Sequence, residues 1–203
     1  MGPAPAKSAQ ALFGIGFYSN MVYEKSDWNY QTFTLDSGMQ AAKEKTASAL
    51  DAVNPDLTAF RAHGGKLILY HGWDDPAISA LNTINYYGDV IAKLGRDNAD
   101  SFTRLYMVPG MQHCGGGPGP DSFGAFTSWP AKDPQHNMHA ALEDWVEKGN
   151  APKMIIASKT AGDNPLGAVT MTRPLCPYPQ AARYKGSGDT NNAENFMCAG
   201  PDK

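Results

Sequence analysis

The stretch KLILYHGWDDP at residues 66–76 decides the fold, because a buried strand ends there in a polar turn. Its apolar run, residues 66–70, is short and bounded by Gly-Gly and His-Gly, which is typical of a strand in a parallel sheet. A helix should follow, with Ser79 as its N-cap and Gly95 as its stop. A second strand is expected over residues 101–108. This order predicts a strand–helix–strand unit with parallel strands and a right-handed crossover.

The rest of the chain extends this α/β pattern unevenly. A second crossover helix is expected over residues 136–150 and a third short strand over residues 153–159. Nearer the N-terminus, residues 36–53 are rich in alanine and predict a further helix. Residues 17–33 carry many aromatic side chains without a clean period, which indicates irregular structure that packs on something else.

Composition and charge exclude several classes of function. The 203 residues include 21 glycines and 15 prolines, well above the average of about 12% for the two together, which indicates many shaped loops. The net charge of −3 and the pI of about 5.9 are not those of a basic protein that would bind the phosphates of a nucleic acid. No apolar stretch approaches the roughly 18–20 residues of a membrane helix. We expect a soluble protein without a nucleic-acid or membrane partner, and its first residues are not typical of a signal peptide.

The three cysteines, Cys114, Cys176 and Cys198, indicate one disulfide and one unpaired thiol. Cys176 and Cys198 flank a polar segment, rich in Pro and Gly, that has little with which to build a core. A crosslink there would stabilise the chain by roughly 3 kcal/mol and favours an exported protein. The alternative is two free, buried thiols in a cytosolic protein.

Two loops of the predicted sheet carry the candidate chemistry. HGWDDP at residues 71–76 and PGMQHC at residues 109–114 both follow strands, and functional loops leave the carboxyl ends of parallel strands. Asp75 and His113 are 38 residues apart, about one crossover, so a carboxylate and an imidazole can meet at one edge of the sheet.

Such a pair forms the orienting half of a Ser-His-Asp triad. The carboxylate accepts the Nδ1–H of the imidazole, fixes its tautomer and stabilises the imidazolium when Nε2 takes a proton. The acid precedes the base, which is the chain order of α/β-hydrolases. Asp74 competes with Asp75, but Pro76 directly after Asp75 should hold that position in an extended turn.

Long motifs make the chain resemble the tannase and feruloyl esterase family, from about residue 17 to residue 199. These motifs are KLILYHGWDDPAIS, RLYMVPGMQHCGGG, ALEDWVEKGNAP and the segment RPLCPYPQAARYKGSGDTNNAENFMC. The resemblance implies an α/β-hydrolase serine esterase, usually secreted, that acts on esters of aromatic acids such as hydroxycinnamates or gallates. The catalytic acid of the family falls on Asp75 and its catalytic base on His113.

The chain departs from the family in its nucleophile. The family places a serine in a glycine-flanked elbow before the acid, with a lid domain that carries a calcium site inserted between them. The serines before Asp75 do not fit this elbow, because none has glycine at both −2 and +2; they are Ser8, Ser19, Ser26, Ser37 and Ser48. The oxyanion-hole amide that the elbow supplies is missing with it.

The chain is therefore expected to be the C-terminal portion of a longer esterase. Residues 1–60 would be the end of the lid and the approach to the core, and residues 61–203 the second half of the catalytic domain.

The missing partner is the N-terminal half of the parent protein. Most of the lid with its calcium is absent, and no cofactor is expected in this chain. In the family, the cysteine after the base pairs with one beside the nucleophile, so Cys114 would lack its partner. The alternative is an inactive fragment or binding module that retains this half of the fold.

The remaining candidates have simpler interpretations. His71 precedes a tight turn, and we expect it to be structural. His136 and His139 have an i, i+3 spacing that can hold a metal, but no third ligand is evident and a solvated face is expected. The aromatics of residues 17–33 could line an acyl pocket, although core or lid packing is the simpler role.

Overall fold

The computed structural model describes residues 8–124 and 131–201, in two compact units that are treated separately below. Unit 1 comprises Met1–Asn54 and unit 2 comprises Pro55–Lys203. The first seven residues, where a leader peptide would begin, lie outside the described part. The lid and core roles assigned to residues 1–60 and 61–203 stay predictions.

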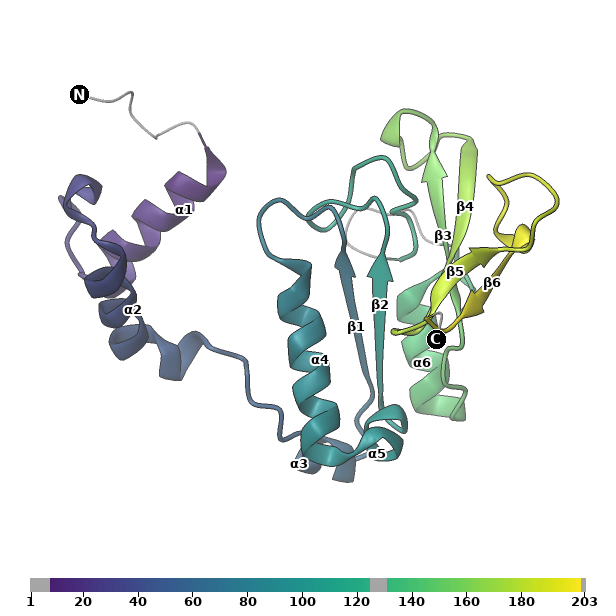
Figure 1. Ribbon diagram of the computed structural model, residues 1–203, viewed down its shortest axis with the longest axis horizontal. Coiled ribbons are helices and arrows are strands. Elements are labelled where there is room, and N and C mark those ends of the chain that lie inside the picture. Colours follow the sequence, from purple (N-terminus) through teal and green to yellow (C-terminus); the bar gives the residue numbers. More distant parts are fainter. Residues whose placement is uncertain (1–7, 125–130, 202–203) are drawn as a thin grey trace. The chain divides into compact units, whose positions relative to one another are not determined.

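A parallel strand pair forms the centre of unit 2 (Figure 1). β1 (Leu67–Gly72) and β2 (Thr103–Val108) run in register from the pair Leu67 and Thr103 to the pair Gly72 and Val108. α4 (Ala80–Leu94) and the short α5 (Arg96–Asp100) make the crossover between them, and α3 (Thr58–Ala62) precedes β1. The predicted α/β fold class is confirmed by this arrangement and by the structural relatives described below.

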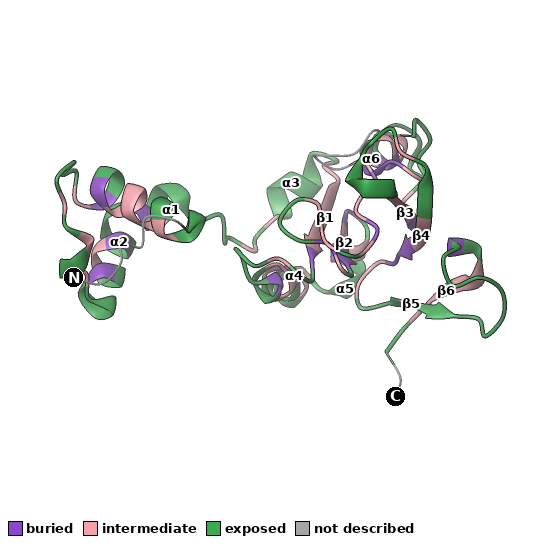
Figure 2. Ribbon diagram, turned by 90° about the horizontal axis from the view of Figure 1, so that it is seen from above, coloured by how far each residue is buried: buried purple, intermediate pink, exposed green. Residues whose placement is uncertain are grey.

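Apolar side chains pack on both faces of this strand pair, as the continuous apolar runs predict, with β2 almost fully buried and β1 partly buried. Side chains alternate between the faces of a strand, so even-numbered and odd-numbered residues enter different clusters. One face packs against α6 (Met138–Lys148), β3 (Ile155–Thr160) and β4 (Val169–Leu175). This face carries Ile68, Tyr70, Tyr106 and Val108. The face toward α4 carries Leu69, Leu105 and Met107. Figure 2 shows the buried residues on these inner surfaces and the exposed ones on the outer sides of the helices.

The third predicted strand forms but does not extend the parallel pair. β3 (Ile155–Thr160) pairs antiparallel with β4 (Val169–Leu175) through the short η3 turn (Ala161–Asp163). A short turn joins antiparallel strands, whereas a parallel neighbour requires a longer crossover. The segment after β4 returns to β2, where the amide of Tyr178 donates to the carbonyl of Leu105 at 2.8 Å.

The polar C-terminal segment folds as a small hairpin that sequence analysis did not predict. β5 (Ala181–Tyr184) pairs antiparallel with β6 (Phe196–Ala199), preceded by η4 (Ala193–Asn195). A disulfide joins Cys176 to Cys198 in β6. The Arg173 guanidinium lies 3.8 Å from the centre of the Phe196 ring, a cation–π contact that ties the hairpin to β4.

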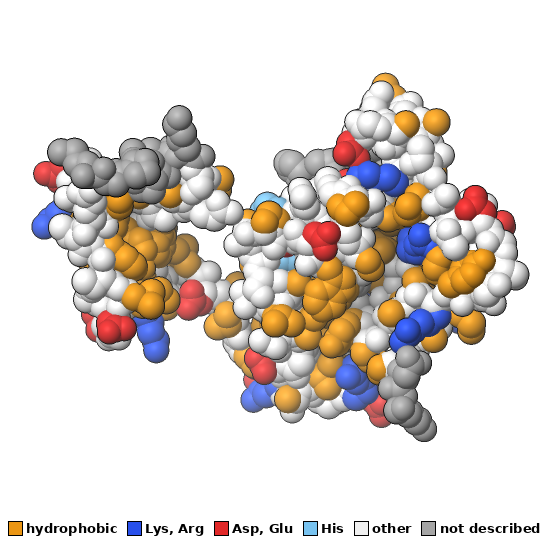
Figure 3. All heavy atoms as spheres, turned by 45° about the horizontal axis from the view of Figure 1, so that its top comes forward, with side chains coloured by type: hydrophobic (Ala, Val, Ile, Leu, Met, Phe, Trp, Pro, Cys, Tyr) orange, Lys and Arg blue, Asp and Glu red, His pale blue; other side chains and the backbone are white. Residues whose placement is uncertain are grey.

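Unit 1 is a small helical body around an aromatic cluster. α1 (Ala9–Phe17) continues into η1 (Tyr18–Val22), and η2 (Tyr30–Thr32) precedes α2 (Leu35–Leu50). The rings lie 4.9 to 6.5 Å apart and belong to Phe17, Tyr18, Tyr23, Trp28 and Phe33. Other apolar side chains of the unit are exposed (Figure 3), among them Leu12, Phe13, Leu35 and Val53. None of the helices in the described ranges has the length and apolar character needed to cross a membrane.

The exposed hairpin makes the disulfide a testable source of stability. We expect Cys198→Ser to lower the free energy of unfolding by about 3 kcal/mol, because the closed loop restricts the unfolded chain. Urea unfolding under non-reducing conditions measures the loss. Cys114→Ser is the matched control, since Cys114 is free and exposed, and it should change the stability by no more than about 0.5 kcal/mol. Equal losses for the two variants would contradict this assignment.

Candidate functional site

The loops after β1 and β2 meet because their backbones touch at the carboxyl end of the strand pair. Gly72 makes this approach possible, since a Cβ atom there would lie 2.2 Å from the carbonyl oxygen of Met111. The amide of Trp73 donates to the carbonyl of Val108 at 3.0 Å, and the amide of Asp74 donates to that of Met111 at 3.1 Å. The two loops are therefore held together by main-chain hydrogen bonds before any side chain contributes.

This contact brings Asp75 and His113 together. Nδ1 of His113 lies 2.9 Å from Oδ2 of Asp75. The Asp75 side chain is only 5% exposed, whereas the His113 side chain is 49% exposed. Asp74, the alternative acid, is exposed and has no hydrogen bond to His113 in the described part of the chain. Of the two adjacent carboxylates, the geometry thus pairs Asp75 with the imidazole.

The Asp75 carboxylate is held by donors on both of its oxygens. Oδ1 accepts the amides of Ala77 at 2.8 Å and Ile78 at 3.0 Å, a local turn that fixes the side-chain rotamer. Burial alone would raise the pKa of Asp75, but the hydrogen bond from His113 and those from the two amides outweigh it and lower the pKa to about 2. Asp75 is thus ionised at any pH at which His113 could act as a base.

His71 contacts the same carboxylate from the end of β1. Its Nε2 lies 3.2 Å from Oδ2 of Asp75, the oxygen that also meets His113. The sequence indicates only a structural role at this position, because a histidine before a turn carries no distinguishing pattern.

A partly buried ion pair holds the glycine-rich segment that follows His113. Lys159 in β3 lies 3.5 Å from Oδ1 of Asp121 and donates to the carbonyl of Gly117 at 2.6 Å, while Oδ2 of Asp121 accepts the amide of Gly116 at 2.6 Å. Lys159 also pairs with Asp163. Burial would lower the pKa of Lys159, but the hydrogen bond to Asp163 and the two carboxylate charges outweigh it and raise the pKa. Sequence reasoning missed this ion pair, since no local motif links its residues.

Cys114 directly follows His113 and has a positive φ angle. Its φ of +62° is unusual for a residue with a side chain, and its thiol is exposed and free. Burial, together with an electrostatic contribution from Cys114, raises the pKa of Tyr70.

The other sequence candidates do not join this site. His136 pairs with Asp133 at 2.8 Å ahead of α6, and His139 is exposed within α6. Across residues 8–124 and 131–201, no three His, Cys, Asp or Glu side chains come together as a metal site would require. The five serines that precede Asp75 all belong to unit 1.

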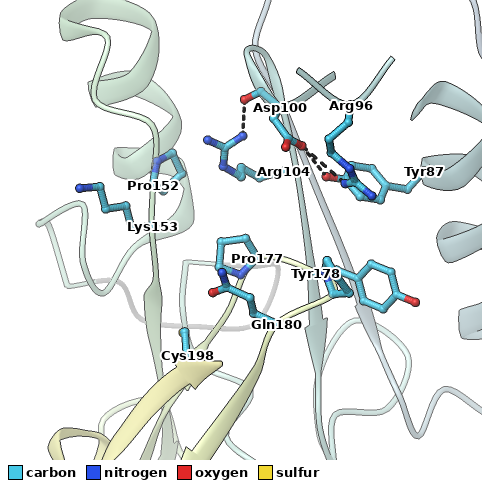
Figure 4. A pocket seen from close by; sticks show the side chains of 11 residues that line it. Tyr87, Arg96, Asp100, Arg104, Pro152, Lys153, Pro177, Tyr178, Gln180 and Cys198 are labelled. Carbon is cyan, nitrogen blue, oxygen red and sulfur yellow. Dashed lines mark hydrogen bonds and ion pairs between the residues drawn. The ribbon is translucent and has the colours of Figure 1, made fainter. Parts of the chain in front are cut away.

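A cavity of about 660 Å³ lies at the opposite end of β2 (Figure 4). Arg104, near the start of that strand, lines it together with α4, α5 and the segment around Tyr178. Its polar groups bind one another: Arg96 pairs with Asp100 at 3.6 Å, and Arg104 donates to the main-chain carbonyl of Asp100. This cavity does not include Asp75 or His113.

The site supports base chemistry at His113. With its Nδ1 proton held by Asp75, the imidazole is fixed in the tautomer whose Nε2 can take a proton. No residue in the described part of the chain occupies Nε2 with a hydrogen bond, and the ring is half exposed.

Comparison with known proteins places this chain in a family. The chain matches the family described as "Tannase and feruloyl esterase" over residues 6–199. It is 41% identical, over 93% of its length, to an uncharacterized esterase of Xanthomonas campestris pv. campestris, of which it covers 36%. It is 49% identical, over 77% of its length, to the mono(2-hydroxyethyl) terephthalate hydrolase of Piscinibacter sakaiensis, of which it covers 24%.

A solved structure gives the same result for the fold. An esterase from Aspergillus oryzae superposes with a TM-score of 0.81 at 31% identity, over 90% of this chain and 36% of that one. The chain thus spans about a third or less of the length of these relatives.

The lowered pKa of Asp75 predicts how stability depends on pH. Relative to its ordinary value of 3.8, a pKa of about 2 means that ionised Asp75 stabilises the folded chain by about 2 kcal/mol above pH 4. This contribution is lost as the pH falls from about 4 to about 2. Asp75→Asn should therefore cost about 2 kcal/mol at pH 7 and progressively less below pH 4, as measured by urea unfolding at several pH values.

Asp74→Asn is the matched control, because Asp74 is exposed beside the same turn. It should change the stability at pH 7 by no more than about 0.5 kcal/mol. A cost of Asp75→Asn that is the same at pH 7 and at low pH would show that the carboxylate charge is not what stabilises the fold.

Proposed function

This chain belongs to the tannase and feruloyl esterase family, and we propose that it carries the acid and the base of a serine-type carboxylic ester hydrolase. Asp75 is the acid and His113 the base. The observation that carries the proposal is the 2.9 Å hydrogen bond between Nδ1 of His113 and Oδ2 of the buried Asp75, made between two loops that the family match covers.

The proposed reaction proceeds through an acyl-enzyme. Nε2 of His113 takes the proton of a serine hydroxyl while the serine oxygen attacks the ester carbonyl, and Asp75 stabilises the imidazolium that forms. The imidazolium then returns the proton to the leaving alcohol. In the second half, His113 takes a proton from water as the water oxygen attacks the acyl-enzyme carbonyl. The bond to the serine oxygen then breaks, the imidazolium returns the proton to that oxygen, and the free acid, the serine hydroxyl and the neutral imidazole result.

The nucleophile in this proposal lies outside the chain, in an N-terminal half of a longer parent esterase. None of the serines before Asp75 stands in a glycine-flanked elbow, and the esterases matched above are about three times as long. That half would also supply the oxyanion-hole amide and a cysteine to pair with Cys114. The free, exposed thiol of Cys114 beside the base agrees with such a pairing.

The proposed substrates are esters of aromatic acids, such as hydroxycinnamates or gallates. The family description names tannase and feruloyl esterase, and one relative is named for hydrolysis of a terephthalate monoester.

We further propose a secreted or periplasmic parent protein, supported by the Cys176–Cys198 disulfide, because disulfides persist in oxidising compartments. No cofactor takes part in the proposed reaction.

A second candidate is a catalytically silent fragment or binding module that retains this half of the fold. It is favoured by the lack of an elbow serine in the 203 residues. The coding sequence upstream of Met1 distinguishes the two, because an in-frame serine elbow flanked by glycines would support the esterase. A genuine start site at Met1 would support the module.

Turnover measurements test whether this chain supplies the acid and the base while the nucleophile lies outside it. We expect the 203-residue chain to hydrolyse neither p-nitrophenyl esters nor methyl hydroxycinnamates, and a version extended upstream through the elbow serine to hydrolyse them. In the extended protein, Asp75→Asn should lower kcat by about 10⁴-fold, and Asp74→Asn should leave it nearly unchanged.

Two results would overturn the proposal. One is turnover by the 203-residue chain that disappears with His113→Ala and with substitution of one of its own serines, which would place the nucleophile within this chain. The other is full activity of the extended protein after His113→Ala.

A further inference from the structure

We propose that His71 is a positioning residue that acts through Asp75. Its Nε2–H donates to Oδ2 of Asp75 and holds that oxygen where it meets Nδ1 of His113. This inference rests on the acid and base roles proposed above, and it assigns a function to a histidine that the sequence pattern left as structural.

The His71 ring is fixed by three structural elements. His71 lies in β1, one residue before Gly72, and its side chain is 12% exposed. Its Nδ1 lies 2.7 Å from Oγ1 of Thr83 in α4, and its Nε2 lies 3.2 Å from the carbonyl oxygen of Ile78. The same Nε2 lies 3.2 Å from Oδ2 of Asp75. The ring thus links the strand, the helix and the acid-bearing loop.

These partners determine which nitrogen of His71 carries the proton. The hydrogen-bond partner of Nε2 is the carbonyl of Ile78, which can only accept, so Nε2 must carry the proton. The Asp75 oxygen 3.2 Å from the same nitrogen can likewise only accept. The Thr83 hydroxyl at Nδ1 can either donate or accept, and in the neutral ring it donates to the bare Nδ1. The network is complete without a positive charge on His71.

His71 places a second nitrogen beside Oδ2 of the Asp75 carboxylate. A carboxylate accepts about four hydrogen bonds. Oδ1 accepts the amides of Ala77 and Ile78, Oδ2 meets Nδ1 of His113 in a hydrogen bond, and Nε2 of His71 lies 3.2 Å from the same Oδ2. Because the carboxylate is 5% exposed, water cannot readily replace a lost donor. Without His71, Oδ2 would keep only the bond from the half-exposed His113, and the carboxylate plane would be less well fixed.

Two substitutions separate positioning from packing. His71→Phe keeps an aromatic ring of similar size but removes the donor. His71→Gln keeps an amide N–H near the position of Nε2 and removes the ring. If His71 only fills space, the phenylalanine variant should preserve the site better than the glutamine variant; if it positions Asp75, the order should be reversed.

The measurement is the tautomer of each imidazole in the 203-residue chain, from two-bond ¹H–¹⁵N correlation spectra at about pH 8, where imidazoles are neutral. In the unmodified chain we expect His71 protonated at Nε2 and His113 protonated at Nδ1. In His71→Phe the ratio of Nδ1–H to Nε2–H tautomer at His113 should fall by about fivefold, the effect of one hydrogen bond. His71→Gln should restore most of that ratio.

Each result either supports or overturns the proposal. A His71 that lacks a proton on Nε2 in the unmodified chain overturns it, and this holds even if a variant fails to fold. An unchanged His113 ratio in a folded His71→Phe variant overturns it too, as does a glutamine variant that behaves like the phenylalanine variant. The spectra require no nucleophile, so the expected tautomers without turnover in the extended protein would reject only the esterase proposal.

Discussion

The hydrogen bond between His113 and Asp75 depends on the parallel pairing of β1 and β2, and the candidate site depends on that bond. The two residues are 38 positions apart, yet in-register strands end together and bring the following loops to one edge. Gly72 then allows the loop backbones to touch, because any side chain there would collide with Met111. Side chains of β1 and β2 enter an apolar cluster on each face, so the loops with Asp75 and His113 leave a well-packed strand pair.

Two sets of contacts fix the positions of Asp75 and of the loop that carries His113. On the acid side, the turn amides and His71 hold the carboxylate in place. On the base side, Lys159 and Asp121 tie the glycine-rich segment after His113 to β3. His113 itself remains half exposed between them. A base of this kind needs a fixed orientation at Nδ1 and an open approach at Nε2, and the packing around it provides this combination.

The sequence predicted those parts of the molecule in which local pattern decides structure. The sequence predicted β1, β2 and the helix that ends at Gly95. Short apolar runs and a terminating glycine are features of neighbouring residues, so they can be recognised without the folded structure. The pairing of β3 with β4 was not predicted, since strand partners are chosen by connection length and packing. The preference for Asp75 over Asp74 rested on Pro76 and on the family resemblance, and the structure pairs Asp75 with His113. The contacts of Lys159 with Asp121 were missed, because side-chain contacts across many residues follow only from the folded backbone.

The central claim is that hydrogen bonds from His113 and two turn amides hold Asp75 in its charged form, and the titration of Asp75 tests this most directly. The ¹³Cγ chemical shift of Asp75, followed by NMR as the pH is lowered, should show a midpoint of about 2. A midpoint at or above the ordinary value of 3.8 would mean that the hydrogen bonds do not hold the charged form, and would contradict the account of the site.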